Sequence, residues 1–210
     1  MIEGAIAVLF RKLSYDSVMT ALNLIIHHKV IRVVGSDRNE IFLCCEALHN
    51  LIFPFKAVVG TKLACLVYHP YVSLRAYKHG EYPFASLMGF DRSLKGRILV
   101  PKQSFVIDID HDWIGFLKGV DSEADYERKL SFDPNSKYFP RRLPLSDVAD
   151  KVDSIKGEVE NQGRTEMNHH EELRVRYLFF EYFCQLLRHL KQGIKPGAYE
   201  KVSSNKANDM

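Results

Sequence analysis

The sequence predicts an α/β fold: a mostly parallel central sheet flanked by helices, followed by a C-terminal helical part. Two observations carry this prediction. Short β-branched runs such as residues 30–34 lack alternation, which is typical of strands covered on both faces. Between such runs, apolar residues recur at steps of three and four, which indicates amphipathic helices. We expect an α/β lobe over 1–120, a helical part over 121–193 and a disordered polar tail over 194–210.

The first helix and strand follow from caps and periodicity. We expect Asp16 to be the N-cap of a helix that closes near Lys29, where positive charge suits a C-terminus. The buried stripe of this helix would contain Val18, Met19, Leu22, Ile25 and Ile26. A buried strand over 30–34, bounded by Gly35, comes next.

A second helix is expected directly after this strand. Either Ser36 or Asp37 can be its N-cap, and Asp37 with Glu40 has the spacing of a capping box. Pro54 would stop the helix. Its core stripe would consist of Ile41, Cys44, Cys45, Leu48 and either Leu51 or Ile52.

Further strands are predicted over 63–68, 82–90 and 104–110. The C-terminal part should contain a surface helix over 145–160, a mobile segment over 158–170 and a long helix over 171–191. The surface helix would bury Val148, Val152 and Ile155. The long helix would bury an apolar face made of Leu173, Tyr177, Phe180, Phe183, Cys184, Leu187 and Leu190.

Composition limits the function. Of the 210 residues, 46% are hydrophobic and 26% charged, which is typical of a soluble globular protein. A formal charge of +3 with scattered Lys and Arg argues against nucleic acid as a partner. Neither a signal peptide nor a membrane-spanning run is recognisable. The four cysteines include no C-x-x-C pair, so we expect a reducing, cytosolic compartment and buried Cys44 and Cys45.

Three alternating aspartates raise the question of a metal. On a strand, Asp108, Asp110 and Asp112 would share one face and could hold a divalent cation, as in D-x-D nucleotide-sugar transferases. The alternative is that Asp108 and Asp110 form the polar end of a strand whose isoleucines are buried. Adjacent histidines at 27–28 and 169–170 lack the i, i+4 spacing of a zinc site. We therefore expect neither a metal nor a cofactor.

Four segments carry a family resemblance. The first comprises Leu9-Phe10, Leu13-Ser14, the helix after them and residues 30–36. The second contains Glu46-Ala47-Leu48 and ends at Pro54-Phe55, the third is Pro83-Phe84 with Gly89, and the fourth is residues 106–110. In this order they resemble the DENN domain family, with its E-A-L…L-x-P-F, P-F-x-x-G and V-x-D-L-D elements. Leu143-Pro144 and residues 174–190 resemble its helical part more loosely.

The resemblance implies a guanine-nucleotide exchange factor or regulator for a Rab small GTPase in membrane trafficking, without covalent chemistry. It implies a cytoplasmic protein, compatible with peripheral recruitment to membranes, and a separate partner supplying the longin-type N-terminal lobe. A DENN-like scaffold or a GTPase-activating assembly subunit without exchange activity is the alternative within the family. The partner surface would contain Ser36, Asp37, Arg38, Pro83, Phe84, Gly89, Asp91, Asp108 and Asp110.

Overall fold

A five-stranded sheet of order β2-β3-β1-β4-β5 organises the computed structural model, which describes residues 2–27, 29–53, 67–72, 86–93, 104–117 and 146–193. The strands are β1 (Val30–Gly35), β2 (Val67–His69), β3 (Ser86–Asp91), β4 (Ser104–Asp108) and β5 (Trp113–Leu117). The helices are α1 (Ala5–Lys12), α2 (Tyr15–Ile26), α3 (Arg38–Leu51), α6 (Ser146–Asn161) and α7 (His169–Gly193).

The sheet is mostly parallel, as the sequence predicts. Central strand β1 pairs in parallel with β3 and β4, and β2 extends the sheet beside β3. The last strand, β5, is antiparallel to β4 and was not expected. The turn before it places Asp112 at a φ of 47°, a left-handed conformation that Asp tolerates better than most residues.

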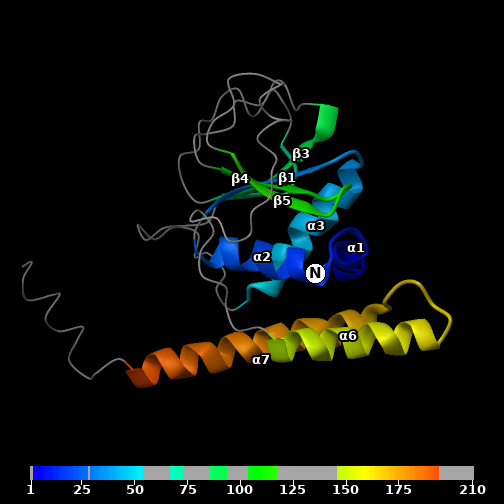
Figure 1. The fold of residues 1–210 in the computed structure, drawn as a ribbon, viewed down its shortest axis with the longest axis vertical. Coiled ribbons are helices and arrows are strands. Elements are labelled where there is room, and N and C mark those ends of the chain that lie inside the picture. The colour runs from blue at the N-terminus through cyan, green and yellow to red at the C-terminus, as the bar shows by residue number, and fades with distance from the viewer. Residues whose placement is uncertain are drawn as a thin grey trace, which may run out of the picture.

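The elements form layers (Figure 1): helices α1, α2 and α3 lie on one side of the sheet, and α6 with α7 lies beyond them. A single apolar cluster joins these layers, from Ile31 and Ile107 in the sheet to Phe183 in α7. The predicted stripe of α3 is confirmed, because Ile41, Cys44, Cys45, Leu48, Leu51 and Ile52 are all buried. Both faces of β1 are buried. Helices α1, α2 and α3 cover one face of the sheet (Figure 1), so the prediction of flanking helices is confirmed for that face.

Helix α2 begins two residues earlier than predicted. Its N-cap is Ser14, whose hydroxyl accepts from the backbone N–H of Ser17 at 3.4 Å, while Asp16 lies in the first turn. Serine and aspartate are equally good caps, so the apolar stripe alone could not choose between them. At the other end, the Lys29 N–H donates to the carbonyl of Leu24, which closes the helix with a backbone bond.

Helix α1 was not predicted, and its N-terminus is completed by a residue far along the chain. The side chain of Glu172 in α7 accepts hydrogen bonds from the backbone N–H groups of Gly4 (3.0 Å) and Ala7 (2.8 Å). A carboxylate at a helix N-terminus satisfies orphan donors and complements the helix dipole. Glu172 is buried, so this contact fastens α7 onto α1.

The α6–α7 hairpin has a defined turn where mobility was expected. Helix α6 continues to Asn161, and Gly163 adopts a φ of 69° before α7 begins at His169. The Glu171 carboxylate holds the turn by accepting from Arg164 Nη1 (2.9 Å) and from the Asn168 N–H (2.7 Å). The turn is therefore hydrogen-bonded in the described structure, and its mobility stays a prediction.

The predicted burial of α6 is confirmed, but that of α7 is partly wrong. Val148, Val152 and Ile155 are buried. In α7 the buried apolar residues are Val175, Phe179 and Phe183, whereas Leu173, Tyr177 and Leu187 are 41%, 62% and 37% exposed. The side chain of Leu190 lies outside the described part. Among the described helices, none has the length and hydropathy of a bilayer span.

Candidate functional site

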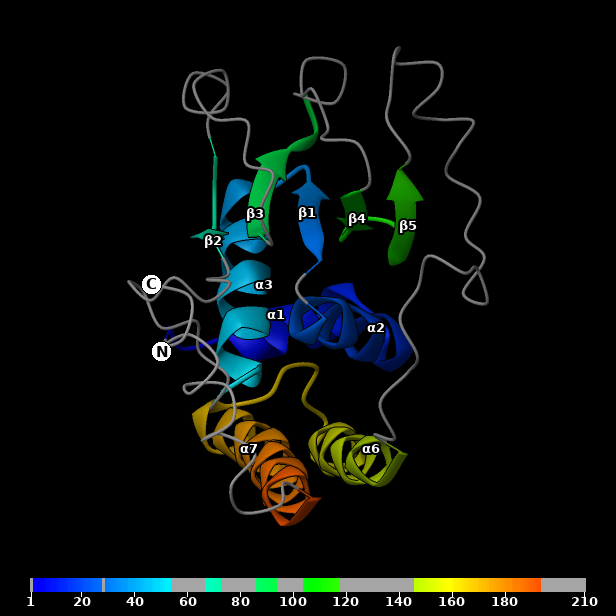
Figure 2. The same ribbon diagram turned by 90° about the vertical axis from the view of Figure 1, so that its left-hand side faces the viewer.

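Three neighbouring parallel strands end on the same edge of the sheet, and polar side chains gather there. Figure 2 shows β3 and β1 side by side, with β4 next to them. Ser36 follows β1, Asp91 closes β3 and Asp108 closes β4. In open α/β sheets the carboxyl ends of the strands are where ligands bind. We call Ser36, Arg38, Asp91, Arg92, Asp108, Asp110 and His111 the carboxyl edge.

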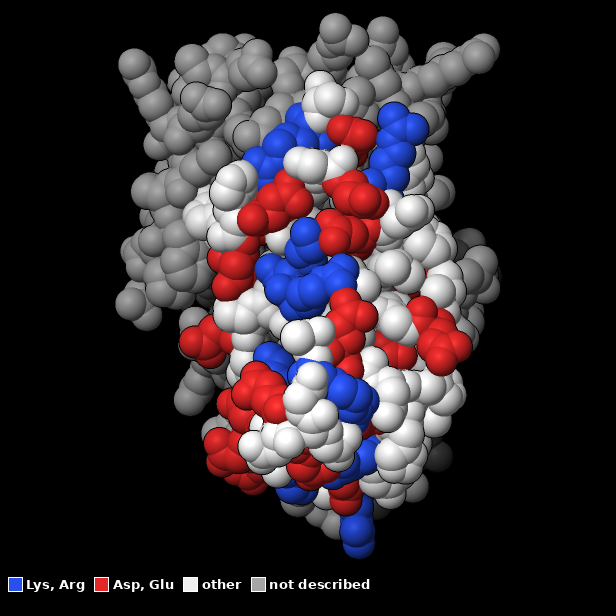
Figure 3. Space-filling view, turned by 90° about the vertical axis from the view of Figure 1, so that its right-hand side faces the viewer, with Lys and Arg blue, Asp and Glu red and all other residues white. Residues whose placement is uncertain are grey.

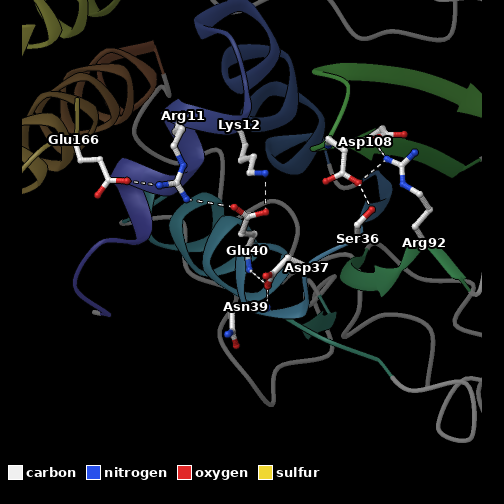
Figure 4. Close-up of polar contacts among 10 residues, drawn as sticks. Arg11, Lys12, Ser36, Asp37, Asn39, Glu40, Arg92, Asp108 and Glu166 are labelled. Carbon is white, nitrogen blue, oxygen red and sulfur yellow. Dashed lines mark hydrogen bonds and ion pairs between the residues drawn. The ribbon is translucent and has the colours of Figure 1, made fainter.

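Arg92 is the centre of the carboxyl edge. Its guanidinium contacts the carboxylate of Asp108 and lies 2.9 Å from that of Asp110. Asp110 also accepts from the Ser36 hydroxyl at 2.8 Å, so residues following β1, β3 and β4 belong to one network (Figure 4). Asp108 is buried, and a buried carboxylate is tolerated because it is paired and hydrogen-bonded.

His111 adds a contact that depends on the tautomer of its ring. Its Nδ1 lies 3.1 Å from Asp108 Oδ2 and 3.1 Å from Arg92 Nη1. When Nδ1 carries a proton it can donate to the carboxylate, and when it does not it can accept from the guanidinium. The tautomer of the His111 ring therefore decides which of the two hydrogen bonds forms.

A second ion pair borders this network. Arg38 Nε lies 3.3 Å from Asp91 Oδ2, and its guanidinium lies 5.8 Å from the ring of Tyr71. The Asp91 carboxylate also accepts from the backbone N–H and hydroxyl of Ser93. These bonds from Ser93, together with Arg38, hold the pKa of Asp91 below its ordinary value. Both charges of this pair therefore persist at neutral pH.

Asp37 has a structural role at the start of α3. Its carboxylate accepts from the backbone N–H groups of Asn39 (2.7 Å) and Glu40 (3.2 Å), which confirms it as the N-cap of α3. The Glu40 carboxylate is directed elsewhere, lying 2.7 Å from Lys12 Nζ and 3.3 Å from Arg11 Nη2. Arg11 also contacts Glu166, so polar contacts run from the α6–α7 turn across α1 to the start of α3 (Figure 4).

Five of the predicted partner-binding residues come together on the carboxyl edge: Ser36, Arg38, Asp91, Asp108 and Asp110. Gly89, by contrast, is buried inside β3. A Cβ there would lie 2.1 Å from the carbonyl oxygen of Pro70, so close packing accounts for this glycine. Pro83 and Phe84 lie outside the described residues. Sequence reasoning missed Arg92 and His111, whose only signal was their position directly after a predicted strand.

The metal hypothesis depended on three aspartates sharing a face, and they do not. Asp112 lies beyond the end of β4 and accepts from the Ser14 N–H at 2.9 Å. Asp108 and Asp110 converge on the cationic Arg92. No group of three His, Cys, Asp or Glu side chains within the described ranges is arranged to hold a metal. Ile107 and Ile109 are buried, in agreement with the alternative that these aspartates form the polar end of a strand.

Cysteine chemistry has no support at Cys44 and Cys45. Cys44 and Cys45 are buried in α3, as predicted. Burial, aided by the nearby Glu40, raises the pKa of the Cys44 thiol to about 12. A thiol in this state is protonated at neutral pH and is a poor nucleophile. Cys44 and Cys45 therefore act as small core residues.

Charge is mixed on one face of the described structure (Figure 3). Figure 3 shows Lys and Arg interspersed with Asp and Glu, without an extended patch of one sign on that face. This distribution differs from the basic stripe that nucleic-acid binding requires. It suits a protein partner, because interspersed charges specify register and orientation through complementary pairs.

Comparison of the sequence with models of known protein families gives no match, and comparison with curated proteins gives none either.

Proposed function

We propose that this chain is a DENN-type regulator of a Rab-family small GTPase, acting as an exchange factor. One observation carries the proposal: five of the six polar residues that the family resemblance assigns to the partner surface gather at one edge of the sheet. Ser36, Asp91 and Asp108 come from segments far apart in the sequence, yet follow or close adjacent parallel strands. This polar edge, with an exposed charge at Arg38, supports binding of a protein partner.

The proposed mechanism is differential binding. An exchange factor favours the nucleotide-free GTPase over the nucleotide-bound form, and this difference in affinity accelerates nucleotide release. At the carboxyl edge, Arg38 pairs with Asp91, and Arg92 pairs with Asp108 and Asp110. A partner with its own charged residues can exchange into the Arg38–Asp91 pair, because Arg38 is exposed. The less exposed Arg92, Asp108 and Asp110 would hold the strand ends in place.

Nucleotide release tests the proposal. Release of a fluorescent GDP analogue from a panel of Rab GTPases would be measured with the full chain, with and without a DENN-family N-terminal lobe supplied in trans. We expect acceleration on at least one Rab, and a roughly tenfold loss in Arg38→Glu, because reversing a charge at an interface rim costs ~1–2 kcal/mol. Lys29→Glu is the matched control, since Lys29 precedes β1 at the opposite end of that strand.

The possible outcomes separate the alternatives. Binding to a Rab without acceleration would contradict exchange activity and support the scaffold alternative. A loss in Arg38→Glu equal to that in Lys29→Glu would contradict the assignment of the carboxyl edge. For the transferase alternative, manganese titration is decisive: binding that is lost in Asp108→Asn would contradict the regulator, whereas the position of Arg92 between the two aspartates predicts no binding.

A further inference from the structure

Helix α7 presents a second apolar face that the core does not use. Leu173, Tyr177, Phe180, Cys184 and Leu187 follow one another at alternating steps of four and three residues. We call these five residues the Tyr177 stripe. It extends for about 21 Å at 1.5 Å per residue. Alternating steps of four and three are the heptad spacing of a helix that packs along another helix.

Two hollows border the Tyr177 stripe. A groove of about 670 Å³ between α6 and α7 has Ile155, Leu173, Tyr177 and Leu178 among its lining residues. A smaller hollow of about 200 Å³ lies where the end of α3 meets α7, and Phe53, Tyr177 and Phe180 line it. Tyr177 belongs to both hollows. Such a continuous apolar surface can receive successive side chains of one docked helix.

Basic side chains line both hollows. Lys151 and Arg174 line the groove, and Arg176 lines the smaller hollow. Among the described residues lining the two hollows, none is Asp or Glu. Glu158 pairs with Arg174 from outside the lining. The flanks of an occupant should therefore be acidic, because opposite charges beside an apolar seam determine partner choice.

We propose that the Tyr177 stripe docks an amphipathic helix of a partner protein, with an apolar heptad seam flanked by acidic residues. The proposal does not depend on the carboxyl edge or on the Rab assignment. A second copy of this chain fits less well, because it would bring Lys151, Arg174 and Arg176 to a surface that is already basic. The chain's own segment 194–210 carries three lysines against Glu200 and Asp209, so it lacks an acidic flank.

Two designed helical peptides test the proposal. Both carry Leu at the seam positions, one with Glu and the other with Lys at the flanking positions. Fluorescence anisotropy with the full chain should show binding of the Glu peptide at least tenfold tighter than the Lys peptide. Tyr177→Asp should abolish this binding while Tyr177→Phe keeps it. Lys151→Glu should remove the preference for the Glu peptide, and Lys29→Glu should leave it unchanged.

Each other outcome overturns the inference. If neither peptide binds, the Tyr177 stripe is not a docking site. If both peptides bind equally, the proposal that the occupant has acidic flanks is wrong. Sedimentation of the chain alone provides a further check: a dimer that Tyr177→Asp dissociates would assign the stripe to a second copy. Thermal unfolding of each variant establishes that it is folded. Tyr177 is 62% exposed, so we expect its substitution to leave the fold intact.

Discussion

Helices α3 and α7 carry apolar stripes of similar appearance in the sequence, yet the fold uses them differently. In α3 every predicted stripe residue is buried against the sheet and its neighbouring helices. In α7 the core takes Val175, Phe179 and Phe183, and leaves Leu173 and Tyr177 largely exposed. Apolar periodicity therefore indicates which residues can be buried. Only the neighbouring elements decide which of them the chain itself buries.

Truncating one side chain on each face of α7 should give the largest difference in the free energy of unfolding. Phe183→Ala should lower the free energy of unfolding by about 3–5 kcal/mol, because Phe183 is fully buried. Tyr177→Ala should cost less than about 1 kcal/mol, as expected for an exposed side chain. Urea denaturation measures both values. Comparable losses would show that Tyr177 belongs to the core.

Removing the charge of Glu172 should have the next largest effect. Glu172→Gln should lower the free energy of unfolding by about 1–3 kcal/mol, because a buried carboxylate that accepts two backbone N–H groups is replaced by a neutral acceptor. Hydrogen exchange at the Ala7 amide should accelerate. Glu160→Gln, at an exposed position of α6, is the control. Unchanged exchange at Ala7 would contradict the long-range cap.

The N-cap of α3 should have a smaller effect. Asp37→Ala should cost about 1 kcal/mol, and Asp37→Asn only a few tenths, because asparagine can also accept from the N–H groups of Asn39 and Glu40. Thermal unfolding of both variants measures the difference. Equal losses would mean that the charge of Asp37, and not its cap, is what stabilises the protein.

Acidification should have the smallest effect. Hydrogen bonds from Arg164 and Asn168 hold the pKa of Glu171 below its ordinary value of 4.5. Ionised Glu171 therefore stabilises the folded state above pH 4.5, and this stabilisation is lost as the pH falls through the lower folded-state pKa. Unfolding measured across this range should show a steeper loss in the wild type than in Glu171→Gln. Parallel curves would contradict this coupling.

The predictable part of the fold consists of local signals. Strand β1 and the buried stripe of α3 follow from neighbouring residues and are confirmed, and of the two candidate caps, Ser36 and Asp37, the structure has Asp37. Helix α1 lacks a local cap, because Gly4 offers no side chain and the acceptor is Glu172. Strand β5 depends on a turn at Asp112 that no glycine marks. Long-range partners of this kind cannot be deduced from sequence spacing.

The candidate site, too, has a part that local sequence signals predict and a part that depends on distant residues. The sequence patterns placed Ser36, Asp91 and Asp108 at the ends of strands, and parallel strands bring such ends to one edge. The patterns could not indicate that Arg92 would lie between Asp108 and Asp110, because this requires the order of the strands in the sheet. Sequence spacing alone therefore does not decide between a metal and an arginine as the partner of Asp108 and Asp110.

The cap on α1 also bears on the biosynthesis of the protein. Residues 4–7 are synthesised well before residue 172, whose carboxylate accepts their N–H groups. Until α7 has been synthesised, these N–H groups lack the acceptor that completes the start of α1 in the folded protein. Contacts of such sequence separation form late and slow folding. A nascent chain stalled before residue 172 should thus expose α1 to proteases and chaperones.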